Sequence, residues 1–212
     1  MNGMSKGSIP IVFDIGGTSM RVAAIRDGAL DDIEIVDTPS EPEEGLKALI
    51  ALAQKIAGTD GISELVGDIS GVVQNGAVFR SPNLPQWNNT DIVGELTHDL
   101  KKPVTLFNDA ELVALGEYWH GAGFHSKTMA YITVSTGVGS ALIVDGKIDK
   151  DGRYNYELGH QLVRGKDHES QISGIAVKKK YGREQKDFTN NVKLKEMEKI
   201  IEEEWLIAGM GW

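Results

Sequence analysis

The chain of 212 residues contains no cysteine, which excludes disulfide bonds and zinc sites built from thiolates. It also has no apolar run near the roughly 20 residues that a membrane-spanning helix needs. Residues 1–10 carry neither the basic nor the apolar region of a secretory signal. We therefore expect a cytoplasmic protein that has no membrane partner.

Basic residues are scarce relative to acidic ones. The 22 lysines and arginines are outnumbered by 31 aspartates and glutamates, so the formal net charge is −9. Such a chain repels a nucleic-acid backbone, which argues against nucleic acid as a partner. Hydrophobic residues at 41% and charged residues at 25% are ordinary for a globular protein, and the length suffices for one large domain or two modest ones.

The most informative stretch is residues 11–25, where an apolar strand is followed by Asp, Gly, Gly and Thr and then by a second strand. Two adjacent glycines permit backbone geometries that a Cβ forbids, and they let a ligand approach the main chain closely. Asp14 and Thr18 bracket the turn with a carboxylate and a hydroxyl, the groups that hold a hydrated Mg²⁺ and a phosphate oxygen. Because residues 21–25 resemble a strand rather than a helix, we expect a β-hairpin. An ordinary tight hairpin without a ligand is the alternative.

Residues 130–144 repeat this arrangement, with an apolar strand, a turn of Thr, Gly, Val and Gly, and another apolar strand. Two such units in one chain indicate a degenerate internal repeat. If each unit opens one of two similar domains, the two turns could face each other across a cleft and hold a polyphosphate from both sides.

The rest of the chain alternates between strand and helix patterns. We expect strands at residues 33–37, 65–73 and 104–107, and helices at 45–57, 91–100, 110–119, 169–181 and 192–210. The proline-rich loop at 81–87 is expected to leave Trp87 exposed. Asn108 and Asp109 lie at the carboxyl end of a strand where a helix begins, which is where open α/β sheets bind ligands. Asp109 could also act only as a helix N-cap.

Taken in order, these motifs resemble those of the ROK family of bacterial sugar kinases, within the actin–hexokinase–Hsp70 superfamily. The matching stretches are residues 14–18, 81–85, 108–110, 116–117, 136–139 and 157–160. The resemblance implies an α/β protein with the actin-like ATPase (ribonuclease H-like) fold, in which two similar domains flank a central cleft. It implies an N-terminal domain at 1–108 and a partial C-terminal domain at 109–212.

The resemblance also implies a function, the ATP-dependent phosphorylation of a hexose or N-acetylhexosamine hydroxyl, with Mg-ATP held between the two glycine turns. Asp109 would be the general base, because a sugar hydroxyl becomes a good nucleophile only when a positioned carboxylate takes its proton. The implied sugar ligands are Asn83, Asn108, Asp109, Glu157, His160 and Glu169. The implied phosphate-binding residues are Asp14, Gly16, Gly17, Thr18, Thr136, Gly137 and Gly139, and Asp14 would also contact Mg²⁺.

Two features depart from the family pattern. Residues 161–168 contain no cysteine where most members have a zinc-binding loop, so we expect no structural zinc. The sequence also stops before the region that would hold the adenine loop, so it resembles a C-terminally truncated member whose ATP binding and turnover stay open. An unfinished second domain would expose apolar surface, which favours a homo-oligomer such as a dimer, or a complementing chain.

Two other functional readings stay open. One is a non-catalytic sugar-binding or regulatory relative. The other is a different member of the superfamily, such as an acetate-kinase-like or chaperone-like ATPase, although such an ATPase has no use for the polyol-binding side chains.

Overall fold

The computed structural model describes residues 7–135, 137–149, 158–163 and 165–182. The chain divides into two units, Met1–Leu112 and Val113–Trp212, each of which contains its own sheet. Within the described residues, no helix has the length and apolar character needed to cross a bilayer. The helix expected at 192–210 lies outside the described residues, as do Thr136 and Glu157.

The first unit is built on a five-stranded sheet with the strand order β3-β2-β1-β4-β7. An antiparallel meander is formed by β1 (Ile9–Ile15), β2 (Ser19–Arg26) and β3 (Ala29–Asp37). On the other side of β1, the parallel strands β4 (Ile62–Ile69) and β7 (Val104–Asn108) extend the sheet. The first glycine turn therefore closes a β-hairpin, which confirms the expectation from sequence.

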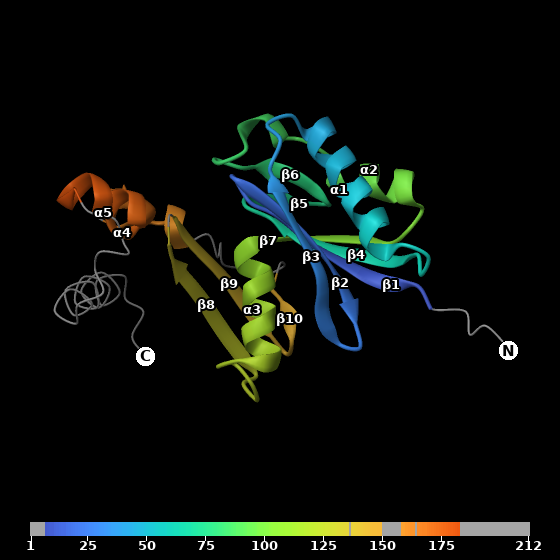
Figure 1. Cartoon of the computed structure of the whole chain (residues 1–212). Coiled ribbons are helices and arrows are strands. Elements are labelled where there is room, and N and C mark those ends of the chain that lie inside the picture. The colour runs from blue at the N-terminus through green and yellow to red at the C-terminus, as the bar shows by residue number, and fades with distance from the viewer. Residues whose placement is uncertain (1–6, 136, 150–157, 164, 183–212) are drawn as a thin grey trace, which may run out of the picture. The chain divides into compact units, whose positions relative to one another are not determined.

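Two helices, α1 (Pro42–Ala57) and α2 (Ile92–Leu100), cover the same face of this sheet (Figure 1). The helical spacing of Leu46, Leu49 and Ala53 places all three in the core, where each is at most 3% exposed. These helices supply the crossovers that parallel strands require.

The strand expected at 65–73 is shorter than predicted, because β4 ends at Ile69. Gly71 has a φ of +154°, and a Cβ there would lie 2.7 Å from the carbonyl oxygen of Arg80. This glycine turns the chain into a separate hairpin of β5 (Val72–Gln74) and β6 (Ala77–Arg80). The apolar pattern of residues 72 and 73 continues across the break, so periodicity alone did not reveal it.

The expectation that Trp87 is exposed is wrong, because this side chain is fully buried. Trp87 ends the 3₁₀ helix η1 (Pro85–Trp87), and its indole Nε1 donates a hydrogen bond to the Pro39 carbonyl oxygen at 3.1 Å. The ring packs over Gly45 of α1, where a Cβ would lie 2.3 Å from the indole. A proline-rich loop predicts a turn, but it does not report the distant glycine that makes room for the ring.

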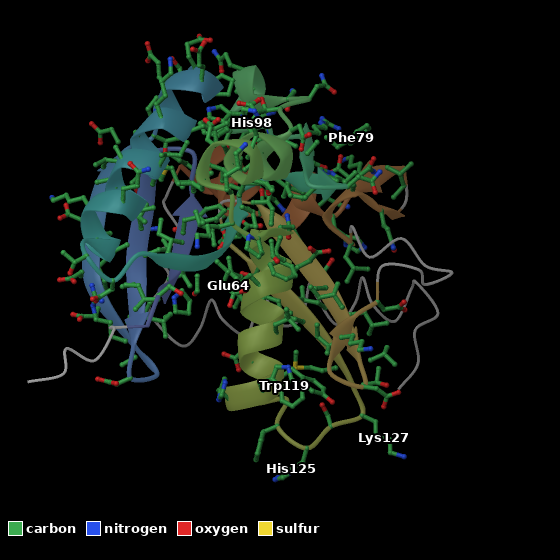
Figure 2. The ribbon with its side chains drawn as sticks, turned by 90° about the vertical axis from the view of Figure 1, so that its right-hand side faces the viewer. Glu64, Phe79, His98, Trp119, His125 and Lys127 are labelled. Atoms are coloured by element: carbon green, nitrogen blue, oxygen red, sulfur yellow. The ribbon has the colours of Figure 1, made fainter. Side chains whose placement is uncertain are left out.

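The second unit contains a three-stranded antiparallel sheet of β8 (Thr128–Val134), β9 (Val138–Val144) and β10 (Lys147–Ile148). The second glycine turn joins β8 to β9, which confirms the second predicted hairpin. The helix α3 (Asp109–His120) begins in the first unit and packs on this sheet around Ala114. Trp119, near the end of α3, lies close to the loop that carries His125 and Lys127 (Figure 2).

The helix expected at 169–181 is two helices, α4 (Glu169–Ile172) and α5 (Gly174–Tyr181). Ser173 separates them with an extended backbone, and its hydroxyl accepts a hydrogen bond from the Ala176 N–H at 3.1 Å. Serine favours such an N-cap position, which explains why the helix restarts there. Before α4 come η2 (Leu158–His160), β11 (Leu162–Val163) and β12 (Lys166–Asp167).

Two helical glycines lead to opposite predictions for the same substitution. At Gly116 of α3 the position that a Cβ would take is open, with no neighbouring atom within 4 Å. Gly116→Ala is therefore expected to raise the free energy of unfolding by about 0.5–1 kcal/mol, through helix propensity alone.

Gly45→Ala is expected to lower the free energy of unfolding by about 2 kcal/mol, because the new methyl group overlaps the buried Trp87 ring. Urea unfolding measures both changes. A Gly45→Ala variant as stable as the wild type would contradict the packing of Trp87 on α1.

Candidate active site

Three carboxylates gather at the carboxyl edge of the parallel strands β1, β4 and β7. The strand register places Asp14 directly opposite Asp68, and Asp109 follows the last residue of β7. Residues directly opposite each other in a sheet project from the same face. Asp68 makes a side-chain hydrogen bond to Asp14, and the charge of Asp109 also acts on it. The first unit thus brings together Asp14 and Asp109, which the family resemblance assigns to one site.

Asp68 is a site residue that the sequence analysis missed. It is 9% exposed, and its pKa is raised to about 8 by desolvation first, then by the charges of Asp14 and Asp109 and by the hydrogen bond to Asp14. The positive charge of Arg21 opposes this rise. The signal in the sequence was a lone Asp, between Gly67 and Ile69, inside an apolar strand.

Arg21 completes the surroundings of Asp14. The two residues are paired across the first hairpin, and the Arg21 guanidinium forms an ion pair with the Asp14 carboxylate at 2.5 Å. Asp14 therefore has a cation on one side and a carboxylic acid that holds its proton, Asp68, on the other. This arrangement fixes the Asp14 carboxylate at the start of the glycine turn.

The first glycine turn is held in place by Thr38, the residue that directly follows β3. The Thr38 hydroxyl donates to the Gly16 carbonyl oxygen at 2.7 Å, and the Thr38 N–H donates to the Thr18 carbonyl oxygen at 3.0 Å. A Cβ on Gly17 would lie 2.7 Å from the Cβ of Asn83. The turn therefore packs against the loop that carries Asn83, and a side chain at Gly17 would not fit.

Asn108 holds the start of α3 in place. Its Nδ2 donates to the Gly71 carbonyl oxygen at 2.7 Å, and its Oδ1 accepts from the Ala110 N–H at 2.9 Å. The Oδ1 of Asp109 also accepts from the Ala110 N–H at 2.9 Å. Asn108 thus shares the capping role that the sequence assigned to Asp109 as its alternative function.

Asp109 is accessible to solvent and yet has a perturbed pKa. Desolvation is the largest cause and raises the pKa of its carboxyl group, and the negative charge of Asp14 raises it further. The hydrogen bond from the Ala110 backbone acts in the opposite direction. An accessible carboxylate with a raised pKa can accept a proton from a bound hydroxyl.

The second unit brings Glu169 to the second glycine turn. The Glu169 Oε2 accepts a hydrogen bond from the Val138 N–H at 2.9 Å. The η2 helix, which carries His160 as an exposed side chain, is fastened to β9 by a bond of 3.1 Å from the Leu158 N–H to the Ser140 Oγ. Gly159 lies so close to β9 that a Cβ would be 2.3 Å from the Val138 carbonyl oxygen.

Comparison with known proteins decides the family. Residues 11–202 match the ROK family. The chain belongs to the ROK family. The predicted α/β class and actin-like ATPase fold are thereby confirmed, since the solved structures of a ROK hexokinase from Thermus thermophilus and a ROK family glucokinase from Streptomyces griseus superpose on this chain with TM-scores of 0.71 and 0.67. The inorganic polyphosphate/ATP-glucomannokinase from Arthrobacter sp. strain KM also superposes, at 33% identity and a TM-score of 0.66, over 82% of this chain and 72% of that protein.

The curated relatives that this chain matches include kinases named for different sugars. The glucokinase of Aeropyrum pernix is 34% identical over 163 residues, 72% of this chain and 49% of the relative. The N-acetylmannosamine kinase of Haemophilus influenzae (strain PittEE) is 27% identical over 158 residues, 72% of this chain and 52% of the relative. The chain spans about half the length of these curated relatives.

The first-unit site has the chemistry to hold the groups that the ROK family implies. Mg²⁺ prefers oxygen ligands, keeps several waters, and is held in phosphoryl-transfer sites by one or two carboxylates together with substrate phosphates. Asp14 fits this role, although no group of three or more ligating side chains among the described residues encloses a metal. Gly16 and Gly17 are required by the packing of the turn itself, because a Cβ would lie 2.9 Å from the Ser19 carbonyl oxygen and 2.7 Å from the Asn83 Cβ, respectively.

Proposed function

We propose that this chain belongs to a sugar kinase that transfers the terminal phosphoryl group of ATP to a hydroxyl of a hexose or N-acetylhexosamine. The observation that carries the proposal is the placement of Asp109, Asp14 and the first glycine turn at one edge of one sheet. Membership of the ROK family and the named glucokinase and N-acetylmannosamine kinase relatives support it.

In the proposed step, Asp109 accepts the proton of the sugar hydroxyl at a carboxylate oxygen. The hydroxyl oxygen forms a bond to the terminal phosphorus, and the bond from that phosphorus to the bridging oxygen of the leaving ADP breaks with its electron pair. Little covalent work falls to the protein, so positioning and charge neutralisation dominate. Asn108 contributes by fixing the start of α3, and hence the position of Asp109.

On the phosphate side, we assign Asp14, Gly16, Gly17 and Thr18 to the first phosphate-binding turn. When bound, Mg²⁺ would neutralise charge on the phosphate oxygens, with Asp14 as its protein contact. The ion pair with Arg21 orients the Asp14 carboxylate for this role. The second glycine turn, with Thr136, Gly137 and Gly139, is assigned to phosphate as well.

On the sugar side, we assign Asn83, Asn108, Glu157, His160 and Glu169 to the hydroxyl groups. Carboxylates and amides discriminate between epimers, because a wrongly placed hydroxyl leaves a buried partner without its hydrogen bond. The packing of Asn83 against Gly17 supports this assignment, since it sets a sugar ligand beside the phosphate turn. The cytoplasmic location and the homodimer expected from the sequence remain predictions.

A coupled kinase assay over hexoses and N-acetylhexosamines, run beside thermal unfolding with each sugar, tests the proposed function. We expect ADP release with at least one sugar that also raises the melting temperature. Stabilisation by a sugar without ADP release would favour the non-catalytic sugar-binding relative. Neither stabilisation nor ADP release with any sugar would contradict both readings.

The raised pKa of Asp109 predicts the pH dependence of the reaction. A base must be ionised to act, so kcat/KM is expected to fall as the pH drops through the pKa of Asp109. Desolvation and the Asp14 charge raise this pKa, so the acid limb is expected above the usual pKa of an aspartate. A pH profile of kcat/KM, with the coupling enzymes in excess at every pH, measures it. An acid limb at the ordinary value for aspartate, or none, would contradict the assignment.

A further inference from the structure

The Glu169 carboxylate accepts a hydrogen bond from the Val138 N–H, a backbone donor of the second glycine turn. Its Oε2 lies 2.9 Å from the Val138 nitrogen and 2.6 Å from the position that a Cβ on Gly137 would take. The carboxylate therefore rests directly over the turn, in space that only a glycine at position 137 leaves open.

The turn and the α4–α5 segment form one hydrogen-bonded assembly around this contact. The Ser135 N–H donates to the Gly137 carbonyl oxygen at 2.8 Å and closes the turn. The Gly174 N–H donates to the Ser135 carbonyl oxygen at 2.7 Å and fastens the start of α5 to the same turn. The backbone on the C-terminal side of Glu169 is thus tied to the turn from whose Val138 N–H its carboxylate accepts a hydrogen bond.

A carboxylate and a phosphate oxygen make the same kind of charge-assisted bond to a backbone N–H. One N–H group cannot serve both at full strength, and two negative groups at one turn repel each other. We propose that Glu169 is a built-in competitor for the phosphate that binds the second glycine turn, so that phosphate binding there requires the carboxylate to leave Val138. This inference rests on the proposed function, which assigns that turn to phosphate.

Displacement of Glu169 has a consequence for the sugar. A carboxylate that has left Val138 can accept hydrogen bonds from sugar hydroxyls, and a sugar that engages Glu169 frees the Val138 N–H for phosphate. Because thermodynamic coupling is reciprocal, each ligand then raises the affinity of the chain for the other.

Calorimetric titration of the full chain with inorganic tripolyphosphate, which carries a phosphate chain without adenine, tests the competition. Glu169→Gln removes the charge and keeps the shape, and Glu169→Ala removes the competitor altogether. Asp145→Asn is the matched control, because it removes one negative charge at the opposite end of the β8–β9 hairpin, in a residue with a φ of +48° that Asn tolerates. The backbone amide signal of Val138 in nitrogen-15 NMR spectra reports whether tripolyphosphate reaches the turn.

We expect tripolyphosphate to bind Glu169→Gln about 10-fold tighter than the wild type, Glu169→Ala at least as tightly, and Asp145→Asn with unchanged affinity. The Val138 signal should shift in each titration. Equal or weaker binding by both Glu169 variants, or equal tightening in Asp145→Asn, would overturn the inference. Absence of binding by all four proteins would also overturn it, and ADP release in the coupled assay decides separately whether the proposed kinase function stands.

Discussion

Replacing Asp109 by Asn is expected to lower the rate of phosphoryl transfer by about 10³-fold while sugar binding is largely retained. The amide has the shape of the carboxyl group and keeps an oxygen that can accept the hydrogen bond from the Ala110 N–H. It cannot accept the proton of the sugar hydroxyl. The loss therefore falls on kcat, which a steady-state assay separates from the sugar affinity measured by thermal shift.

Asp27→Asn provides the control for this experiment. Asp27 lies in the turn between β2 and β3 with a φ of +51°, a conformation that Asn tolerates, and it takes no part in the proposed site. This control should turn over at the wild-type rate. Turnover near the wild-type rate in Asp109→Asn would remove Asp109 as the base, and equal loss of sugar binding and turnover would make it a binding residue instead.

Replacing Asp68 by Asn is expected to stabilise the first unit strongly at neutral pH. In the folded chain desolvation, the Asp14 and Asp109 charges and the Asp14 hydrogen bond raise the pKa of Asp68 from 3.8 to about 8. The unfolded chain therefore releases this proton at a much lower pH than the folded chain does. Between those two pKa values, the stability of the folded state falls as the pH rises.

The size and the pH window of this effect follow from proton linkage. Below the unfolded pKa both states hold the proton, and Asp68 changes nothing. At pH 7 the raised pKa of Asp68 destabilises the folded state by roughly 4 kcal/mol. The penalty keeps growing with pH and is complete only above the pKa that Asp68 has in the folded chain. An amide carries no such proton and still donates a hydrogen bond to Asp14, so Asp68→Asn removes the penalty.

Urea unfolding followed by circular dichroism at several pH values measures the gain. The stabilisation by Asp68→Asn should grow from acid to neutral pH. Asp37→Asn, a change at an exposed carboxylate at the end of β3, should alter the free energy of unfolding by less than about 0.5 kcal/mol. A gain that does not depend on pH, or a loss of stability, would show that Asp68 is ionised in the folded chain.

These two aspartates differ in how they could be found. Asp109 stands next to Asn108 at the end of an apolar strand, in a motif that resembles the family, so the sequence was sufficient to single it out. Asp68 belongs to no motif. Its partner Asp14 is 54 residues away in the sequence and becomes its neighbour only through the parallel register of β1 and β4.

Loops and the breaks within elements were harder to predict than the two glycine hairpins. Trp87 follows two prolines and resembles an exposed loop residue, yet Gly45 in α1 leaves the space that buries it. The break at Ser173 interrupts a pattern that is helical on both sides. In both places the deciding contact joins residues that no local pattern connects.

The sequence by itself determined both glycine hairpins, the helices α1, α2 and α3, and membership of the ROK family, because each depends on backbone preferences or on motifs within a few residues. Only the tertiary structure decided that Asp68 lies beside Asp14 and that Glu169 covers the Val138 N–H. Strand register and the docking of helices set those contacts, and both arise from packing between segments that are distant in the chain.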